Sequence, residues 1–386
     1  MATKKKKILF LHTSYKFLGG EDVAVQNEIE FLKQHYDVDT VFLNNKNKNY
    51  FFVFFSLFFN NNIRNYKIIK RKIESFNPDV VYIHNTWFEF PFKVFNLLKD
   101  QKIIVLKKLH NYRISCASSY LLKNHINQNE FCPACGNESK KFYFNKYYEN
   151  SYIKSFFIIK HSRKLLNYLQ TNSVQIIVLN KFQKLNIIKL GIPEQKVHIL
   201  PNYIKFEENT KLEKENNYVL YAGRISKEKG VRELIQSFLN SELSEVKLKI
   251  IGTGPLLKKI KEEFNDKRIN YFDELTNKKT LELVKDALVV VTATKLYEVQ
   301  PNLLCEASAF KVPSIFPNNG GISEYFPNGY PLSFKNGDYA ELTQKLNMIL
   351  NLKRMKEIGI SNYNFLNQKL NDKHLINKLE EIINIS

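Results

Sequence analysis

The chain has 386 residues, 44% of them hydrophobic, and this length exceeds one typical domain and suffices for the cores of two. The net charge of +20 is concentrated in residues 1–200, which hold 31 Lys and Arg against 14 Asp and Glu. Such a basic half attracts polyanions, whether nucleic acid, anionic lipid or phosphorylated substrates. Four cysteines exclude a disulfide scaffold, and no apolar run reaches the roughly 18 residues of a membrane-spanning helix.

The first half of the chain alternates short apolar runs with helical patterns. The run at 8–11 predicts a buried strand, and Gly19-Gly20 separates it from a helix predicted near 23–33. Further strands are predicted at 38–43, 80–83, 103–106, 176–179 and 197–200. Residues 204–216 are polar and rich in charge, and we interpret them as a linker.

The alternation begins again after the linker. Strands are predicted at 218–221, 246–251, 269–272, 289–291 and 312–316. Helices are predicted at 231–239, from about 255, at 281–288, at 302–309 and throughout the chain from about 338. Alternating strands and helices are typical of βαβ units, which build a parallel sheet covered by helices on both faces.

The two halves therefore predict an α/β fold of two Rossmann-like, doubly wound parallel-sheet domains. We place these domains at 1–203 and 204–365, and we expect 366–386 to form a C-terminal helix that packs back toward the first domain. Ligands of such folds bind at the carboxyl ends of the strands. We therefore expect the functional site in a cleft between the domains.

Two glycine pairs lie where a predicted strand turns into a helix. Gly19-Gly20 and Gly320-Gly321 would let the backbone approach a ligand closely, and a helix N-terminus favours an anion. Either pair alone is equally compatible with an ordinary turn. Gly252-Thr253-Gly254 predicts a turn and not a nicotinamide-cofactor site, because the third glycine of that fingerprint is absent.

Charged side chains follow the strands of the second half. Arg224 and Lys229 flank a loop that opens a helix, and together they can neutralise a diphosphate. Glu306 lies in a predicted helix and can accept two hydrogen bonds from a ribose diol, while Glu298 can reach sugar hydroxyls. The plainer alternatives are a solvated charged turn, an exposed loop acid and a helix cap.

The combined pattern resembles the retaining glycosyltransferases of family 4, which have the GT-B fold. It consists of Gly-Arg-x4-Lys-Gly at 223–230, Glu-x7-Glu at 298–306 and Gly-Gly-x2-Glu at 320–324, each after a predicted strand. The resemblance covers nearly the whole chain, and residues 109–113 resemble a signature of bacterial surface-polysaccharide members.

This resemblance implies an acceptor-side first domain, a second domain that binds the nucleotide sugar, and a role for each motif residue. The residues implied in catalysis are His110, Glu298, Arg224 and Lys229. Those implied in donor binding are Gly19, Gly20, Arg224, Lys229, Glu306, Gly320 and Gly321. Neither a catalytic metal nor a cofactor is expected, because the two cations neutralise the leaving diphosphate. One departure is Val299, where many members have glycine, and it leaves the identity of the sugar open.

We therefore expect a hexosyl transfer from a nucleotide-diphosphate sugar to a glycan or lipid-linked acceptor of a capsule, O-antigen or exopolysaccharide. The expected location is the cytoplasm, either free or peripheral on the inner face of the cytoplasmic membrane. Two alternatives stay open, namely another GT-B enzyme such as a nucleotide-sugar epimerase, and a basic nucleic-acid-binding protein. No nucleic acid is expected as a partner, because no nucleic-acid-binding module is recognisable.

Two weaker signals lie in the first half. Cys116, Cys132 and Cys135 cluster with the spacing of a metal knuckle, so they are either ligands of a structural zinc ion or reduced thiols. Residues 51–59 are strongly apolar, and a basic segment follows at 64–72. Together they predict contact with an anionic membrane surface, and residues 155–167 are similar in character. The alternative is a core helix with a solvated face.

Overall fold

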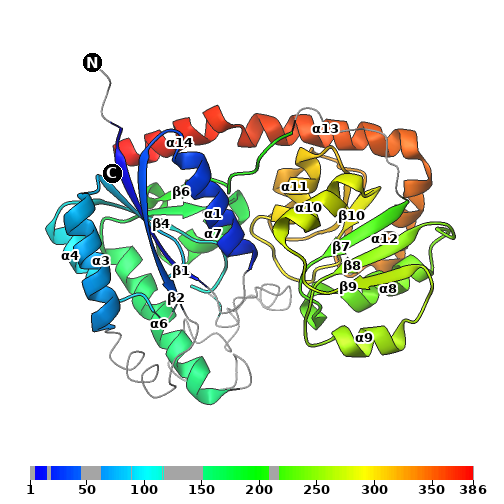
Figure 1. The fold of residues 1–386 in the computed structure, drawn as a ribbon, viewed down its shortest axis with the longest axis horizontal. Coiled ribbons are helices and arrows are strands. Elements are labelled where there is room, and N and C mark those ends of the chain that lie inside the picture. The colour runs from blue at the N-terminus through cyan, green and yellow to red at the C-terminus, as the bar shows by residue number, and fades with distance from the viewer. Residues whose placement is uncertain are drawn as a thin grey trace. The chain divides into compact units, whose positions relative to one another are not determined.

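The computed structural model describes residues 5–14, 19–44, 62–87, 89–114, 116, 151–207 and 217–385. It divides into two compact units. Unit 1 comprises Met1–Tyr203 and Leu375–Ser386, and unit 2 comprises Ile204–His374. Each unit is built on one six-stranded parallel sheet (Figure 1).

The sheet of unit 1 has the strand order β2-β1-β3-β4-β5-β6. Its strands are β1 (Lys7–Ser14), β2 (Asp37–Asn44), β3 (Val80–Ile83), β4 (Ile104–Lys108), β5 (Gln175–Val178) and β6 (Val197–Ile199). Strand β1 is an interior strand, because Ile8 pairs with Val38 on one side and with Val80 on the other. All four residues of β3 are completely buried, which explains why this strand reads as an unbroken apolar run.

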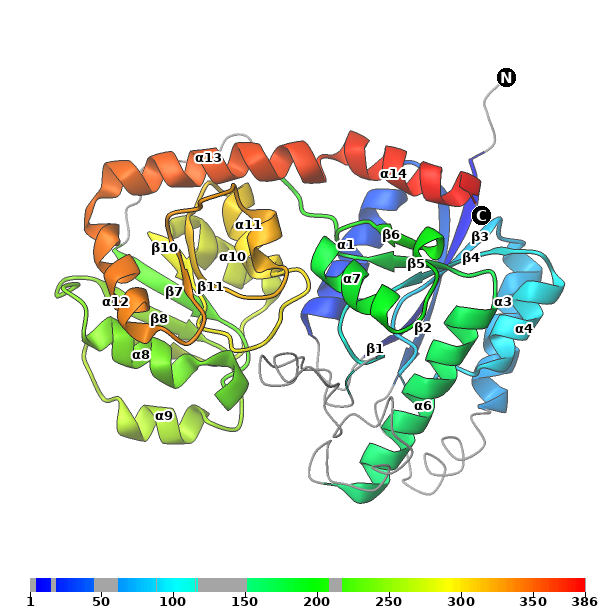
Figure 2. The ribbon, with the colours of Figure 1, turned by 180° about the vertical axis from the view of Figure 1, so that it is seen from behind.

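Helices cover both faces of this sheet. They are α1 (Gly20–Leu32), α3 (Ile63–Phe76), α4 (Lys93–Asp100), α6 (Tyr152–Thr171), α7 (Lys181–Lys189) and, from the C-terminal segment, α14 (Asp372–Ile385). Helix α1 lies in front of the sheet in Figure 1, whereas α6 lies in front of it in the reverse view of Figure 2. Leu165 and Leu169 of α6 pack into the same apolar core as Leu9 and Leu11 of β1.

Helix α14 is bound to unit 1 by polar and apolar contacts. The Tyr36 hydroxyl donates to Glu380 Oε1 at 3.4 Å, and Lys6 Nζ donates to Asn384 Oδ1 at 3.0 Å. The buried residues of α14 are Leu375, Leu379, Ile382 and Ile383. This apolar stripe has helical spacing, so one face of α14 is part of the core.

The sheet of unit 2 has the strand order β12-β11-β10-β7-β8-β9. Its strands are β7 (Tyr218–Ala222), β8 (Lys247–Ile251), β9 (Ile269–Phe272), β10 (Val289–Val291), β11 (Ser314–Asn318) and β12 (Ser333–Lys335). Its α-helices are α8 (Val231–Leu239), α9 (Leu257–Glu263), α10 (Asn277–Asp286), α11 (Asn302–Ala309), α12 (Tyr339–Asn347) and α13 (Leu352–Leu370). Counted within the unit, this order is 3-2-1-4-5-6 reversed, as in a dinucleotide-binding Rossmann sheet.

The predicted architecture of two doubly wound parallel sheets is confirmed, and several elements match to the residue. Strands β3, β9 and β10 and helices α8 and α11 have the bounds that the sequence predicts. The cleft expected between the domains stays a prediction. No helix among the described residues is long and apolar enough to cross a membrane.

Candidate active site

Lys229 is brought to the carboxyl edge of the second sheet by a glycine. It ends a short 3-10 helix, Lys227–Lys229, and Gly230 follows with a φ of +66°. A Cβ on Gly230 would lie 2.1 Å from the carbonyl oxygen of Ala293, so no other residue fits there without moving the backbone. This close approach places the loop after β7 against the loop after β10.

A direct ion pair joins the two loops. Lys229 Nζ lies 2.5 Å from Glu298 Oε1, and the Thr294 hydroxyl donates to the same oxygen at 3.1 Å. Both charged side chains are about one quarter exposed, at 27% for Lys229 and 24% for Glu298. Within the described chain the second carboxylate oxygen, Glu298 Oε2, has no hydrogen-bond partner, so it can accept one from a ligand.

Arg224 lies two residues beyond the end of β7 and is exposed. The backbone at Arg224 is fixed by a hydrogen bond, because the Tyr221 hydroxyl donates to the Arg224 carbonyl at 2.9 Å. The glycines at 252 and 254 support the same loop, since a Cβ on either would lie about 2 Å from the carbonyl oxygen of Gly223 or Ile225. The turn predicted at 252–254 is therefore explained by close backbone packing.

Glu306 lies in α11, and its carboxylate is only partly reached by solvent. Burial raises its pKa to about 7. Among the described residues no donor forms a hydrogen bond or ion pair with this carboxylate. A half-buried acid without a protein partner is a group that a ligand can satisfy.

The glycine pair at 320–321 supports the loop that carries Glu298. Gly320 has a φ of +61°, and a Cβ there would lie 3.0 Å from the Tyr297 Cα. The Gly321 N–H donates to the Glu298 carbonyl at 3.3 Å, so it is already used within the protein. Val299 is buried, and its backbone is not in the left-handed region, so this loop avoids the conformation that glycine would allow.

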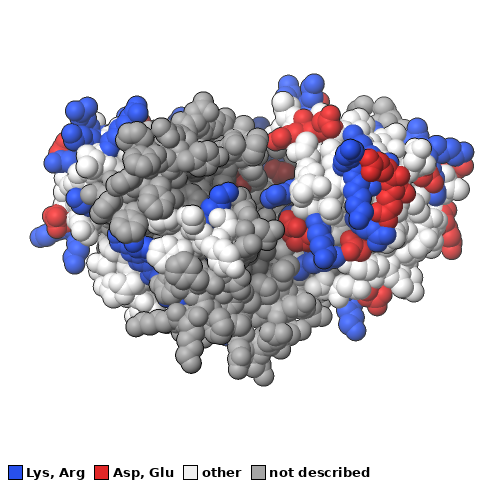
Figure 3. Space-filling view, turned by 90° about the horizontal axis from the view of Figure 1, so that it is seen from below, with Lys and Arg blue, Asp and Glu red and all other residues white. Residues whose placement is uncertain are grey.

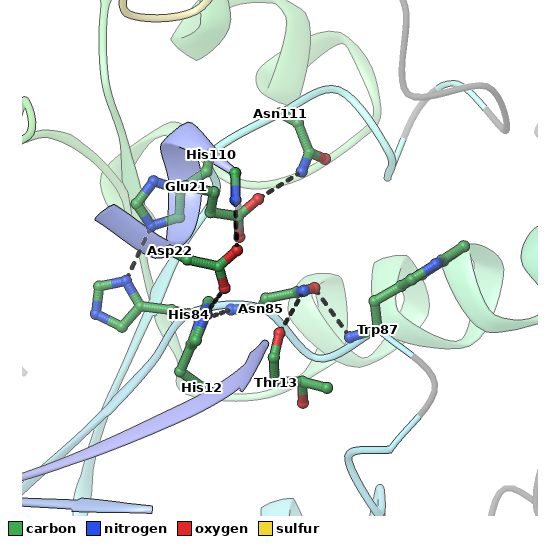
Figure 4. A network of polar contacts seen from close by, with 10 residues as sticks. His12, Thr13, Glu21, Asp22, His84, Asn85, Trp87, His110 and Asn111 are labelled. Carbon is green, nitrogen blue, oxygen red and sulfur yellow. Dashed lines mark hydrogen bonds and ion pairs between the residues drawn. The ribbon is translucent and has the colours of Figure 1, made fainter. Parts of the chain in front are cut away.

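In unit 1, the turn at Gly19-Gly20 is held by a polar network (Figure 4). Asp22 accepts from the Gly19 N–H at 3.0 Å and from His12 Nε2 at 2.8 Å. The Asn85 N–H points at His12 Nδ1 at 3.4 Å, which leaves the proton on Nε2. Sequence reasoning missed this role of Asp22, whose position three residues after Gly19 is a capping signal.

A small pocket lies beside this network, where β3 and β4 end. Its volume is about 40 Å³, and its walls include Glu21, Trp87, His110, Arg113 and His161. His110 Nε2 lies 2.9 Å from Nδ1 of His84, and Asn111 Nδ2 donates to Glu21 Oε2 at 3.2 Å. The Arg113 guanidinium stacks 4.2 Å above the Trp87 ring. A site of this size admits a water molecule or a single polar group of a ligand.

Two buried lysines stand behind the pocket, and the sequence analysis missed both. Lys108 Nζ lies 2.9 Å from both carboxylate oxygens of Glu28, which also accepts from the Tyr82 hydroxyl. Lys107 donates to the carbonyls of His84 and Lys108, and burial lowers its pKa to about 7. The sequence has one weak sign of this burial, because the Lys-Lys pair comes directly after a strand-like apolar run, where a solvated charge is unusual.

The weaker sequence signals are only partly within the described residues. Cys116 is buried, whereas Cys132 and Cys135 lie outside the described residues, as do residues 51–59. The basic segment predicted at 64–72 lies within α3. The exposed residues of that helix form one helical face with three cations and one acid, namely Ile63, Arg64, Lys67, Ile68, Arg71, Glu74 and Ser75. In unit 2, by contrast, basic and acidic side chains are intermixed on the face shown in Figure 3.

Comparison with known proteins finds a family model that matches the second half of the chain. Residues 203–363 match the family model for Glycosyl transferases group 1, and that segment contains Arg224, Lys229, Glu298 and Glu306. The capsular polysaccharide biosynthesis glycosyltransferase CapM of Staphylococcus aureus is 26% identical over 59% of this chain. The match spans 65% of the length of CapM.

Solved structures share the fold over nearly the whole chain. Anabaena Alr3699/HepE, in complex with UDP and glucose, superposes with a TM-score of 0.69 at 13% identity and covers 99% of this chain and 100% of its own. The sucrose-phosphate synthase of Thermosynechococcus elongatus gives a TM-score of 0.68 at 13% identity, with 99% of each chain covered. The fold is therefore GT-B, as predicted.

Proposed function

We propose that this chain is a retaining glycosyltransferase that transfers a hexosyl unit from a nucleotide-diphosphate sugar to a glycan or lipid-linked acceptor. The observation that carries the proposal is the contact between Lys229 and Glu298, made within the segment that matches the glycosyltransferase model. A cation and a carboxylate at one strand edge suit a substrate that has a diphosphate beside sugar hydroxyls.

Each group of the site has a part in this reaction. Arg224 and Lys229 neutralise the charge that builds on the diphosphate as it leaves, in the place where other enzymes use a metal ion. Glu298 holds Lys229 with Oε1 and offers Oε2 to a hydroxyl of the transferred sugar. Glu306 accepts hydrogen bonds from the ribose diol once it is ionised.

The groups of unit 1 complete the proposal. The Gly19-Gly20 turn receives a phosphate oxygen, because Gly20 has no described atom within 4 Å of the position of a Cβ and so leaves room for close approach. His110 contacts the donor sugar. The glycines at 320–321 contribute by holding the Glu298 loop, since the Gly321 N–H is used within the protein.

The pathway and location are also proposals. CapM is by its name a protein of capsular polysaccharide biosynthesis, which supports a role in surface polysaccharide synthesis. The solved HepE complexes hold UDP, UDP with glucose, or UDP-glucose, which makes UDP-sugars the first donors to test. We place the protein in the cytoplasm, with the exposed basic face of α3 on the anionic inner surface of the membrane.

A donor screen followed by a transfer assay tests this function. UDP-, GDP- and ADP-sugars are added to the purified protein, and a donor at 100 times its Kd raises the unfolding free energy by about 2.7 kcal/mol. The stabilising donor is then incubated with lipid-linked acceptors, and the anomeric configuration of the product is read by NMR. Inversion at the anomeric carbon contradicts the retaining mechanism.

The competing functions give different results in the same experiments. An epimerase converts its donor with the acceptor omitted, whereas the proposed transferase leaves the sugar unchanged. A nucleic-acid-binding protein binds generic DNA with a steep salt dependence and is not stabilised by any nucleotide sugar. Either result contradicts the proposed function.

A further inference from the structure

Two histidines meet at the carboxyl ends of neighbouring strands in unit 1. His84 follows β3 and His110 follows β4, and Nδ1 of the first lies 2.9 Å from Nε2 of the second. Their rings stack with centroids 5.2 Å apart at 26°. The close view in Figure 4 shows the two rings side by side, joined by this hydrogen bond.

His84 is the rigid member of the pair. Its side chain is completely buried, and its ring packs on Phe10 at 5.2 Å and on Tyr82 at 4.5 Å. The backbone N–H of His84 donates to the Leu11 carbonyl at 2.9 Å, and the backbone carbonyl of His84 accepts from Lys107 Nζ. Backbone and ring are therefore both held in place, so His84 offers His110 a fixed hydrogen-bonding partner.

Both imidazoles are neutral near pH 7. Burial lowers the pKa of each ring well below its usual range, and the nearby charges of Lys107 and Lys108 lower it further. One proton therefore lies between the two rings, and only two arrangements are possible. Either His84 Nδ1–H donates to His110, or His110 Nε2–H donates to His84.

The second nitrogen of each ring decides between the two arrangements. Within the described residues, His84 Nε2 is buried without a hydrogen-bond partner. An orphaned N–H is rarer and less tolerated in protein interiors than an orphaned acceptor. In either arrangement one buried N–H has no partner among the described residues, at His84 Nε2 or at His110 Nδ1. His84 is completely buried, whereas His110 is partly exposed, so the unpaired N–H is better tolerated on the His110 ring, which a ligand can reach. The arrangement with the shared proton on His84 Nδ1 is therefore favoured.

We propose that His84 is a positioning residue that holds His110 in the Nδ1–H tautomer, so that His110 presents a hydrogen-bond donor and not a base to the substrate. This proposal rests on the proposed function, which gives His110 a substrate to contact. In the described chain His110 Nδ1 has no partner, and His110 lines the pocket beside Glu21 and Asn111. His110 Nδ1–H would donate a hydrogen bond to a substrate oxygen with a free lone pair, such as a sugar hydroxyl or a phosphate oxygen.

Nitrogen NMR of the histidine-labelled protein tests the tautomer directly. The expected result is a proton on Nδ1 of both His84 and His110 and a bare Nε2 on both rings. A proton on Nε2 of either ring overturns the proposal. This measurement needs no turnover, so it decides on the tautomer even if no donor or acceptor is found and the proposed function fails.

A matched pair of variants tests the effect on activity. His84→Asn keeps an amide N–H that can donate to His110 Nε2, and it should keep transfer within about tenfold of the parent. His84→Asp offers only acceptors, forces a proton onto His110 Nε2, and should lower kcat about 100-fold or more, with the KM for the donor changed much less. Equal activity of the two folded variants contradicts the proposal, and if His84→Asp does not fold, the NMR measurement decides alone.

Discussion

Lys229 and Glu298 lie 69 positions apart in the sequence and 2.5 Å apart in unit 2. The contact joins the loop after β7 to the loop after β10, and Thr294 binds the same carboxylate oxygen. A partly exposed pair of this kind contributes only about 1 kcal/mol to stability. Its position at the carboxyl edge of the sheet is therefore better explained by substrate binding than by folding.

The first prediction separates function from stability at this pair. Lys229→Met and Glu298→Gln should each lower kcat/KM for transfer at least 100-fold, because each removes a group that stabilises charge in the transition state. The midpoint of thermal unfolding should change by only a few degrees. Lys227→Met, in the same loop but exposed, is the matched control and should keep full activity. Full activity in both site variants contradicts the site.

The second prediction concerns the pH dependence of stability. The pKa of Glu306 is about 7 in the native state against about 4.5 when unfolded, so the native state favours the protonated acid. The free energy of unfolding is therefore highest below pH 4.5 and falls as the pH rises through 7. The loss is at most about 3 kcal/mol, and solvent that reaches the side chain reduces it. Glu306→Gln should remove this loss in denaturant titrations between pH 4.5 and 8, whereas Glu282→Gln, on the exposed face of α10, should not.

The same titration predicts how donor affinity changes with pH. A carboxylate accepts hydrogen bonds from both hydroxyls of a ribose diol, whereas a protonated acid keeps only its carbonyl oxygen as a good acceptor. The affinity for UDP-glucose should therefore rise with pH through about 7. Calorimetry of the parent and of Glu306→Gln measures this dependence. An affinity that is flat in the parent, or equally steep in the variant, excludes Glu306 from the donor site.

The third prediction contrasts two glycines. Gly20→Ala meets no described atom within 4 Å, so we expect a folded protein of nearly unchanged stability that has lost at least tenfold in donor affinity. Gly230→Ala should instead lower the unfolding free energy by about 2–4 kcal/mol, because its Cβ would lie 2.1 Å from the Ala293 carbonyl oxygen. Chemical denaturation and donor titration of both variants give the comparison. Normal donor binding by Gly20→Ala would remove the turn from the site.

The fourth prediction concerns the buried pair behind the pocket. Lys108→Met should lower the unfolding free energy by about 3–5 kcal/mol, because Glu28 is then left buried without its cation. Adding Glu28→Gln should recover much of this loss. Lys72→Met, which breaks a partly exposed pair with Asp39, is the control and should cost less than about 1 kcal/mol. Similar losses for the two single variants would contradict a buried pair.

The fifth prediction tests the membrane face of α3. The parent protein should cosediment with vesicles that contain anionic lipid, and changing Arg64, Lys67 and Arg71 together to Glu should abolish this binding. Neither the parent nor the triple variant should bind purely zwitterionic vesicles. The matched control changes Lys258, Lys259 and Lys261 of α9, which are exposed and carry the same charge. Equal losses in the two triple variants would point to net charge alone and contradict a specific face.

Much of the fold was predictable because its signals are local. A buried parallel strand such as β3 is an unbroken apolar run, and the bounds of α8 and α11 follow from helical periodicity. Strand β4 shows the limit, because the sequence ended it at residue 106, whereas Lys107 and Lys108 are buried within it. Lys108 is paired with Glu28, 80 positions away, and Lys107 donates to the His84 carbonyl, 23 positions away, so no local pattern identifies these partners.

The candidate site divides in the same way. Arg224, Lys229, Glu298 and Glu306 were found because each belongs to a short motif that follows a strand. The contact between His84 and His110 was not found, because it requires knowing that β3 and β4 are neighbours in the sheet. The use of the Gly321 N–H by the Glu298 carbonyl is a backbone contact, and the sequence has no signal for it.

Helix α14 has a consequence for how the protein is made. Residues 375–386 belong to unit 1, although the ribosome produces them only after the whole of unit 2. The first sheet can form early in translation, but Leu375, Leu379 and Ile382 cover its core last. A nascent chain stalled before α14 should therefore expose an apolar groove in unit 1 and become a client of chaperones, even when unit 2 is already folded.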